Sequence, residues 1–405
     1  MPERGQAEQQ VAELLRTARR SLGLDLAFLS RMDGTVQHLE VIESELPLPD
    51  GMTQPQETSF CQAIIDGVLP AVIPDVAEFP AALRLPGAEL GIRSFISVPV
   101  QLSDGTVYGT FCGAGLTADP RLTERDRALM QVLAQAAAMI MEPDVRQRRR
   151  NAEIEARLRP LMRRGGPMVL LQPIVDLATG RRVGAEALSR FPQEWHRPPD
   201  ECFADAEAID ERESLEIAAL HRAATHLSAV SGYIAMNISP ATLFTAEGRR
   251  FLERLPLERI VLELSEHDPI HDYDHLRGVL APLRARGMRL AIDDVGAGFS
   301  SLRHIVATAP DVIKLDRSIV SGVAGDHVLS VVVRALTDLA GAVGATVVAE
   351  GVETAADAAT LAHAGVHLGQ GWHFDRATTP ADLRDSYPVK REAALPQSSG
   401  STRPA

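Results

Sequence analysis

Basic residues, cysteine and long apolar runs are all scarce in this chain of 405 residues. Lys and Arg number 41 against 54 Asp and Glu, which leaves a formal net charge of −13 at pH 7. This charge argues against a general binder of nucleic acid or anionic membranes, because such proteins attract phosphate with a surplus of basic side chains. No apolar run approaches the roughly 18 residues of a membrane span, and residues 1–10 lack the apolar region of a signal peptide. We therefore expect a soluble, cytoplasmic protein that binds neither DNA nor membranes.

The three cysteines, Cys61, Cys112 and Cys202, are scattered along the chain and odd in number. No two of them form a C-x-x-C pair, which argues against a disulfide framework and against a zinc site. A reducing compartment agrees with this pattern.

The length predicts two domains, because single hydrophobic cores stop growing at about 250–300 residues. In the first part of the chain, a helical period from Glu8 to Leu22 precedes several short strand-like runs. Ser103-Asp104-Gly105 supplies a hairpin turn between two of the runs, and Thr123 to Asp126 resembles a capping box that opens another helix. An antiparallel sheet with flanking helices, an α+β domain, is the predicted structure. Its strands are expected at 26–31, 36–42, 71–74, 94–100 and 107–112.

Two sequence motifs at these strands resemble those of a known family, Gly91-Ile92-Arg93-Ser94-Phe95-Ile96-Ser97-Val98-Pro99-Val100 and Tyr108-Gly109-Thr110-Phe111-Cys112. With the order of elements they resemble a GAF sensory domain, which we assign to residues 1–142. A sensor of an unknown small molecule and a dimerising module without a ligand both fit. Cys61 is followed by Gln62, whereas many bilin-binding cysteines are followed by His, so a small buried thiol is favoured over chromophore attachment.

Pro143 lacks a backbone donor and restricts the residue before it, which predicts that the preceding helix ends or kinks there and does not continue as one signalling helix. Residues 143–164 are charged and helix-prone and are interpreted as a helical linker. The basic run Arg146–Arg150 could instead contact nucleic acid, but the acidic balance of the whole chain favours a solvated linker. Residues 388–405 are rich in Ser, Gly and Pro towards the end and are predicted to form a disordered tail.

Residues 165–387 alternate short apolar runs with longer helical stretches, which is the pattern of parallel βα units. Eight such runs predict a closed, TIM-like (β/α)8 barrel, an α/β domain. The runs are 168–172, 183–187, 233–237, 260–264, 290–293, 312–314, 346–350 and 366–370.

A carboxylate, an amide or a lysine closes nearly every run: Gln172, Glu186, Asn237, Glu263, Asp293, Lys314, Glu350 and Gln370. The carboxyl ends of parallel barrel strands converge on one face, so these side chains are expected to meet. Crowded carboxylates repel one another and are costly to bury, and divalent cations resolve both problems. Oxygen ligands without Cys or His indicate a hard ion, Mg²⁺ or Mn²⁺. The adjacent pair Asp293-Asp294 suits two cations that share a carboxylate, the arrangement used in phosphodiester hydrolysis.

The same residues resemble the EAL family of cyclic di-GMP phosphodiesterases, whose name motif stands intact as Glu186-Ala187-Leu188. The accompanying motifs occur in order: Gln172-Pro173-Ile174, Asn237-Ile238-Ser239-Pro240, Glu263-Leu264-Ser265-Glu266, Asp293-Asp294-Val295-Gly296-Ala297-Gly298-Phe299, Ile313-Lys314-Leu315-Asp316, Glu350-Gly351-Val352-Glu353 and Gln370-Gly371. Two positions depart from the family pattern. Val295 replaces the usual Phe and leaves the coupling of the Gly-rich loop in doubt, and Trp372 stands where Tyr is common.

The resemblance implies a role for each matching residue. One cation would be held by Glu186, Asn237, Glu263 and Asp293, and the second by Asp293, Asp294 and Glu350. Water would attack phosphorus with Lys314 orienting or stabilising it, Glu350 acting as the base and Glu266 steadying the Gly-rich loop. Substrate contacts would be made by Gln172, Leu188, Arg190, Glu353 and Gln370. The implied product is linear pGpG, and the implied assembly is a homodimer.

Two other functions remain open at this point. A non-hydrolytic receptor would bind cyclic di-GMP and signal to a partner protein. Degenerate relatives of that kind usually lack metal ligands or the base, whereas all are present here. A scaffold with a vestigial barrel would bind no nucleotide at all.

Overall fold

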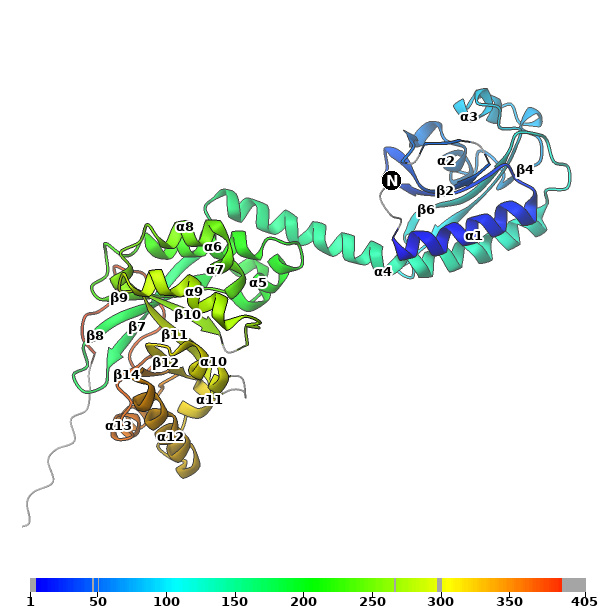
Figure 1. Ribbon diagram of the computed structural model, residues 1–405. Helices are drawn as coiled ribbons and strands as arrows, with labels where there is room; N and C mark the ends of the chain where they lie inside the picture. Colours follow the sequence, from blue (N-terminus) through cyan, green and yellow to red (C-terminus); the bar gives the residue numbers. More distant parts are fainter. Residues whose placement is uncertain (1–4, 46, 50, 266, 297–300, 388–405) are drawn as a thin grey trace, which may run out of the picture. The chain divides into compact units, whose positions relative to one another are not determined.

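The structure is a computed structural model that describes residues 5–45, 47–49, 51–265, 267–296 and 301–387, in two compact units, Met1–Ala152 and Glu153–Ala405 (Figure 1). Within these ranges no helix is both long enough and apolar enough to cross a bilayer. The predicted tail at 388–405 lies outside the described residues.

The first unit is an antiparallel sheet in the order β3-β2-β1-β6-β5-β4, flanked by helices. Its strands are β1 (Leu26–Met32), β2 (Val36–Ser44), β3 (Thr53–Pro55), β4 (Val72–Ile73), β5 (Ser94–Gln101) and β6 (Val107–Gly115). Its helices are α1 (Gln6–Leu22), α2 (Phe60–Ile65), α3 (Pro86–Glu89) and the first part of α4 (Glu124–Arg163). The predicted α+β domain is confirmed, and β3 is a strand that the sequence pattern did not indicate.

Both faces of this sheet are buried, because successive side chains of a strand point to opposite faces. Leu29 of β1 packs in a core with Leu15 of α1 and Met130 of α4. Its neighbour Phe28 packs in the other core, with Phe60 of α2 and residues of β5 and β6. The sheet is therefore a middle layer between α1 with α4 on one side and α2 on the other.

Helix α4 is continuous over 40 residues. Of the two outcomes predicted at Pro143, an end of the helix is therefore wrong, and a kink stays a prediction. Pro143 is exposed, and so is Met139, whose carbonyl would have accepted the missing hydrogen bond. Water can satisfy that carbonyl, which lowers the cost of the proline. Val145 of α4 packs in the core of the first unit, and Ile154 is buried in the second unit.

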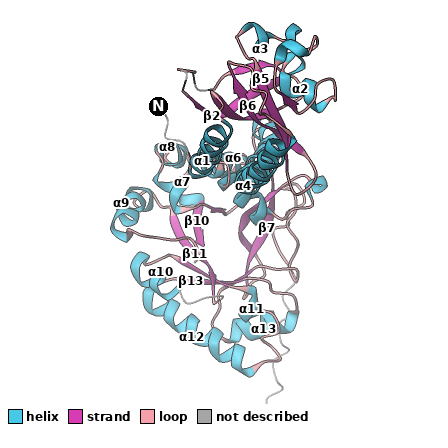
Figure 2. Cartoon of the chain, turned by 90° about the vertical axis from the view of Figure 1, so that its right-hand side faces the viewer, coloured by secondary structure: helices cyan, strands magenta, loops and turns pink. Residues whose placement is uncertain are grey.

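The second unit is a closed barrel in the order β10-β11-β12-β13-β14-β7-β8-β9, as predicted. The strands are β7 (Met168–Asp176), β8 (Arg182–Arg190), β9 (Tyr233–Asn237), β10 (Ile260–Ser265), β11 (Arg289–Val295), β12 (Val312–Leu315), β13 (Thr346–Ala349) and β14 (Leu368–Gly369). Helices lie outside the strands (Figure 2). They are α5 (Pro199–Glu207), α6 (Arg212–Ala224), α7 (Pro240–Phe244), α8 (Ala246–Leu252), α9 (Tyr273–Arg284), α10 (Ser301–Thr308), α11 (Arg317–Val320), α12 (His327–Val343) and α13 (Ala355–His363).

The barrel is not entirely parallel, which corrects the expectation of eight parallel strands. Strand β7 runs antiparallel to both of its neighbours, β8 and β14. Only a short turn separates β7 from β8, and a parallel pair would need a crossover of about a dozen residues or more. The amide of Gln172 therefore reaches the barrel mouth from the middle of a strand, directly opposite Glu186.

Candidate metal centre

Strand register brings the predicted polar residues together at one end of the barrel. Asn237 of β9 lies directly opposite Glu263 of β10, and Ser265 lies opposite Asp293 of β11. Asn237 donates a hydrogen bond from Nδ2 to Glu186 Oε1 at 3.1 Å. The convergence predicted from the strand ends is thus present.

Lys314 is the centre of this cluster and is 1% exposed. Its Nζ lies 2.8 Å from Glu350 Oε1, 3.0 Å from both Glu263 Oε1 and Asp293 Oδ2, and 3.5 Å from Glu186 Oε2. Four carboxylates therefore share one ammonium group, and the cluster keeps an excess of negative charge.

The pKa values reflect that excess. Burial raises the pKa of Glu263 well above its ordinary value and raises that of Glu350 to about 8, although Lys314 opposes both shifts. Burial also acts on Glu186, but Lys314 and the amides of Gln370 and Asn237 bring its pKa below the ordinary value. Burial alone would lower the pKa of Lys314, and the four carboxylates raise it instead. Without a further cation the cluster binds extra protons.

Two sets of carboxylates are close enough to hold cations, and they share Asp293. Oxygen atoms of Glu186, Glu263 and Asp293 lie within 4.8 Å of one another, and so do those of Asp293, Asp294 and Glu350. Consecutive strand residues normally point to opposite faces. Here Asp294 has a φ of 61°, and the β11–β12 register shifts between Ile292 and Val295. The bulge and the left-handed residue allow both aspartates to serve one centre.

Two buried oxygen atoms of the cluster lack a hydrogen-bond partner among the described residues, Glu263 Oε2 and the amide oxygen of Gln370. A buried carboxylate oxygen without a donor is costly, and a hard cation at this point would satisfy it. The residues therefore fit a divalent cation held by oxygen ligands.

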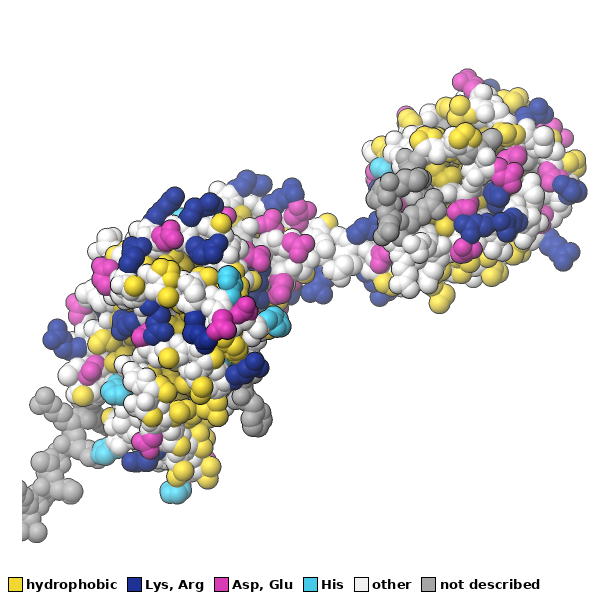
Figure 3. Space-filling view, in the orientation of Figure 1, with side chains coloured by type: hydrophobic (Ala, Val, Ile, Leu, Met, Phe, Trp, Pro, Cys, Tyr) yellow, Lys and Arg dark blue, Asp and Glu magenta, His cyan; other side chains and the backbone are white. Residues whose placement is uncertain are grey.

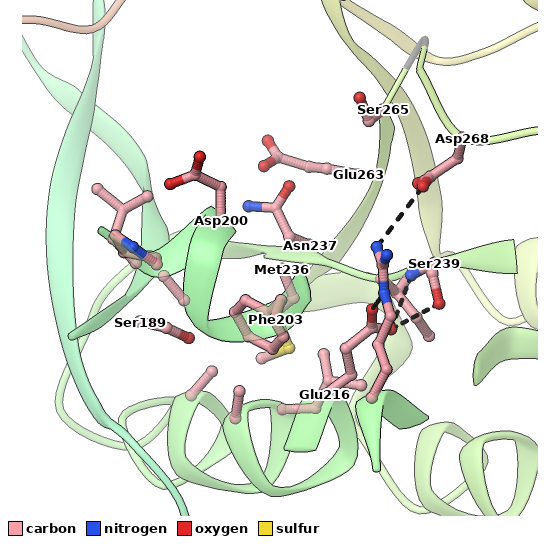
Figure 4. Close-up of a pocket in the computed structure, with 18 of the residues that line it drawn as sticks. Ser189, Asp200, Phe203, Glu216, Met236, Asn237, Ser239, Glu263, Ser265 and Asp268 are labelled. Atoms are coloured by element: carbon pink, nitrogen blue, oxygen red, sulfur yellow. Dashed lines mark hydrogen bonds and ion pairs between the residues drawn. The ribbon is translucent and has the colours of Figure 1, made fainter. Parts of the chain in front are cut away.

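A cleft of about 710 Å³ opens beside the cluster and is lined by Asn237, Glu263, Leu188 and Arg190. In Figure 4, the polar ends of Glu263 and Asn237 lie close together, and Asp200 of α5 lies across from them. The volume falls within the range of small-molecule sites. A small molecule in this cleft would lie next to Asn237 and Glu263 of the cluster.

Comparison with known proteins identifies the second unit. The sequence profile of the EAL domain matches residues 155–377, more than half of the chain, and that of the GAF domain matches residues 7–142. The chain belongs to the EAL domain family.

The relatives of this chain include one named for its activity and others whose activity is not assigned. The chain is 31% identical to the Mycobacterium bovis protein Mb1392c, over 62% of this chain and 89% of that protein. It is 32% identical to the Escherichia coli cyclic di-GMP phosphodiesterase PdeL, over 50% of this chain and 60% of that protein. The structure of Klebsiella pneumoniae BlrP1 with calcium and cyclic di-GMP is similar at a TM-score of 0.50 and 32% identity, covering 55% of this chain and 59% of that one.

The predicted substrate residues of the EAL domain fall into three groups. Gln370 donates from Nε2 to both Gln172 and Glu186, and so joins the carboxylate cluster, while Leu188 and Arg190 line the cleft. Glu353 instead forms an ion pair with Arg317 at 2.6 Å. Glu266 lies outside the described residues. The roles of all six residues remain predictions.

One supporting residue of the EAL domain was missed from the sequence. Glu216 of α6 is buried and accepts hydrogen bonds from both the backbone N–H and the hydroxyl of Ser239, two residues after Asn237. Arg212 donates a hydrogen bond from Nε to the other carboxylate oxygen of Glu216, Oε1, at 2.9 Å. A signal was present, because Glu216 stands four residues before buried Leu220, on the apolar face of its helix.

The raised pKa of Glu350 gives a pH-dependent stability in chelator. The folded protein keeps this proton up to about pH 8, whereas the unfolded chain releases it near the ordinary value of 4.5. The contribution of Glu350 is therefore fully present below 4.5 and is lost as the pH rises through about 8. Urea unfolding in EDTA should show wild type losing stability relative to Glu350→Gln across this window and no further change above it. A stability difference that is independent of pH, or that grows with pH, contradicts the assignment.

Proposed function

We propose that the EAL domain hydrolyses cyclic di-GMP to linear pGpG with two bound Mg²⁺ or Mn²⁺ ions. The observation that carries the proposal is the pair of carboxylate sets that share Asp293 around buried Lys314. The related PdeL is a cyclic di-GMP phosphodiesterase, and the BlrP1 structure contains cyclic di-GMP, which supports the same substrate.

The proposed ligand sets follow the predicted ones. Bound cations would supply Lewis acidity, which activates water and neutralises the charge of the phosphodiester. The first ion would be held by Glu186, Asn237, Glu263 and Asp293, and the second by Asp293, Asp294 and Glu350.

The side chains of this chain would do the remaining chemistry. Glu350, hydrogen-bonded to Lys314, is placed to take the proton from the attacking water, and the Lys314 ammonium offsets charge that develops on the phosphoryl oxygens. Arg190 at the cleft wall suits a phosphate oxygen through its forked donors. We assign further substrate contacts to Gln172, Leu188, Glu353 and Gln370, and the steadying of the loop after Asp294 to Glu266.

We also infer that the GAF domain regulates this activity through α4. Val145 of this helix is buried in the first unit and Leu158 in the second. Because one helix packs in both units, we infer that a change in packing at one of its ends alters the packing at the other.

The test of the proposed function is the product formed from cyclic di-GMP by the purified chain. We expect pGpG to appear with Mn²⁺ or Mg²⁺ and no turnover in EDTA. Tight binding of cyclic di-GMP in EDTA without conversion after metal is added would establish the alternative, a non-hydrolytic receptor. If cyclic di-GMP binds neither in EDTA nor with metal, the remaining hypothesis is a scaffold with a vestigial barrel.

A homodimer is proposed for the second unit because apolar side chains gather on α10 and α12 (Figure 3). Leu302 and Val306 of α10 are exposed, as are Val328, Val331 and Val332 of α12. A contiguous group of exposed apolar side chains commonly marks an interaction surface, and a second copy would cover this one.

Charge on this surface should separate the protomers. We expect the double change Val306→Glu and Val331→Glu to weaken self-association by roughly 100-fold or more, because burying an unpaired charge costs several kcal/mol. Light scattering over a dilution series measures the effect. Leu90→Glu, at an exposed apolar position of the first unit, is the matched control. A wild-type chain that is monomeric at all concentrations, or a double variant that stays dimeric, contradicts the proposed surface.

A further inference from the structure

A series of hydrogen-bonded polar side chains is buried in the first unit and ends in two thiols. Gln37 donates from Nε2 to Ser30 Oγ at 2.7 Å, and Ser30 Oγ lies 2.8 Å from Thr110 Oγ1. Cys112 Sγ donates to Thr110 Oγ1 at 3.1 Å, and Cys61 Sγ lies 3.2 Å from Cys112 Sγ. All five residues are buried. Apolar side chains could fill this space at a lower free-energy cost of burial. The buried polar side chains therefore suggest a chemical role.

The two thiols come from elements that are distant in sequence. Cys61 lies in the first turn of α2, and Cys112 lies in β6, where its strand neighbours are β1 and β5. Both are free thiols. A disulfide bond is about 2.05 Å long, so the two sulfur atoms need to approach each other by only about 1.2 Å.

The surroundings favour one thiolate beside one thiol. Burial acts to raise the pKa of Cys61, but hydrogen bonds from Cys112, Thr110, Gln37 and Ser97 bring it down to about 7. Burial and the neighbouring Cys61 raise the pKa of Cys112. A thiolate is the nucleophile in thiol oxidation, and an adjacent thiol can resolve the product.

We propose that Cys61 and Cys112 form a reversible intramolecular disulfide when the protein meets hydrogen peroxide, so that the first unit is a thiol redox sensor. The Cys61 thiolate attacks one peroxide oxygen, the O–O bond breaks, and protonation of the leaving oxygen gives water and a sulfenic acid. Cys112 sulfur then attacks the sulfenic sulfur, the S–S bond forms, the S–O bond breaks, and a second water leaves with the thiol proton. Two electrons pass from the sulfur atoms to the peroxide. A dithiol reductant then reduces the disulfide to the two thiols and is itself oxidised to a disulfide.

The test uses the full chain, hydrogen peroxide and mass spectrometry. The reduced protein has three alkylatable cysteines, and we expect treatment with peroxide to leave one. The intact mass should fall by two hydrogen atoms, the peptide map should contain a Cys61–Cys112 link, and dithiothreitol should restore all three thiols.

Two variants distinguish this site from other thiol chemistry. Cys202→Ser changes the thiol of the second unit and should retain the link. Cys112→Ser should remove the link and leave a sulfenic acid on Cys61 that dimedone traps, with circular dichroism to confirm folding. The wild-type peptide map needs no variant and decides the question alone. Three remaining thiols after prolonged treatment, a link through Cys202, or a sulfinic acid on Cys61 without the link would each overturn the proposal.

Discussion

Glu263→Gln should reduce metal-dependent turnover of cyclic di-GMP by about 100-fold or more. Glu263 is 1% exposed, contributes to the first carboxylate set and has a buried oxygen without a donor. Glutamine keeps the shape but removes the charge and one metal-binding oxygen. Loss of a hydrogen-bond partner of a ligand already costs about 10–100-fold in metal affinity or activity, so loss of a direct ligand should cost at least the upper value.

The dependence on metal concentration separates this loss from misfolding. A ligand defect should move half-maximal activity to higher Mn²⁺ concentration, so that excess Mn²⁺ recovers part of the rate. Glu253→Gln changes an exposed carboxylate of the same domain and should leave the curve unchanged. A Glu263→Gln protein with the wild-type rate and the wild-type metal curve would remove Glu263 from the metal site.

Lys314→Met should abolish turnover and also destabilise the metal-free protein by about 3–5 kcal/mol, the cost of leaving buried charge without its partner. Four carboxylates lie within 3.5 Å of the ammonium group. In EDTA at pH 8 the variant has no cation with which to neutralise them. Saturating Mn²⁺ should recover much of this stability, because the ion replaces the missing positive charge, without recovering the rate.

Urea unfolding with and without metal measures both parts of this prediction. Arg254→Met removes an exposed cation from the same domain and should change stability little. If Lys314→Met is as stable as wild type in EDTA, Lys314 does not neutralise the carboxylates.

Much of the barrel and its cluster could be predicted from the sequence because the information is local. Each strand is a short apolar run, and the polar residue that closes the run marks the barrel mouth. Glu186, Asn237, Glu263 and Asp293 were placed in this way, and the structure brings them together.

Other features depend on contacts that no local pattern records. The φ of 61° at Asp294 arises with a bulge between β11 and β12, and the contact between Cys61 and Cys112 joins a helix to a strand 51 residues away. The antiparallel β7 was foreseeable from the short turn that contains Gly180, but a repeating βα pattern favoured parallel strands. The end of the helix predicted at Pro143 was wrong because the free-energy cost of a proline in a helix depends on whether the carbonyl that loses its hydrogen bond faces water.

The most direct test of the account is the anomalous diffraction of manganese in crystals of the protein grown with Mn²⁺. Two peaks are expected in each barrel, on either side of Asp293: one among Glu186, Asn237 and Glu263, and the other beside Asp294 and Glu350. Absence of manganese from the barrel mouth, or manganese bound only at other sites, would contradict the central claim that paired cations balance these carboxylates.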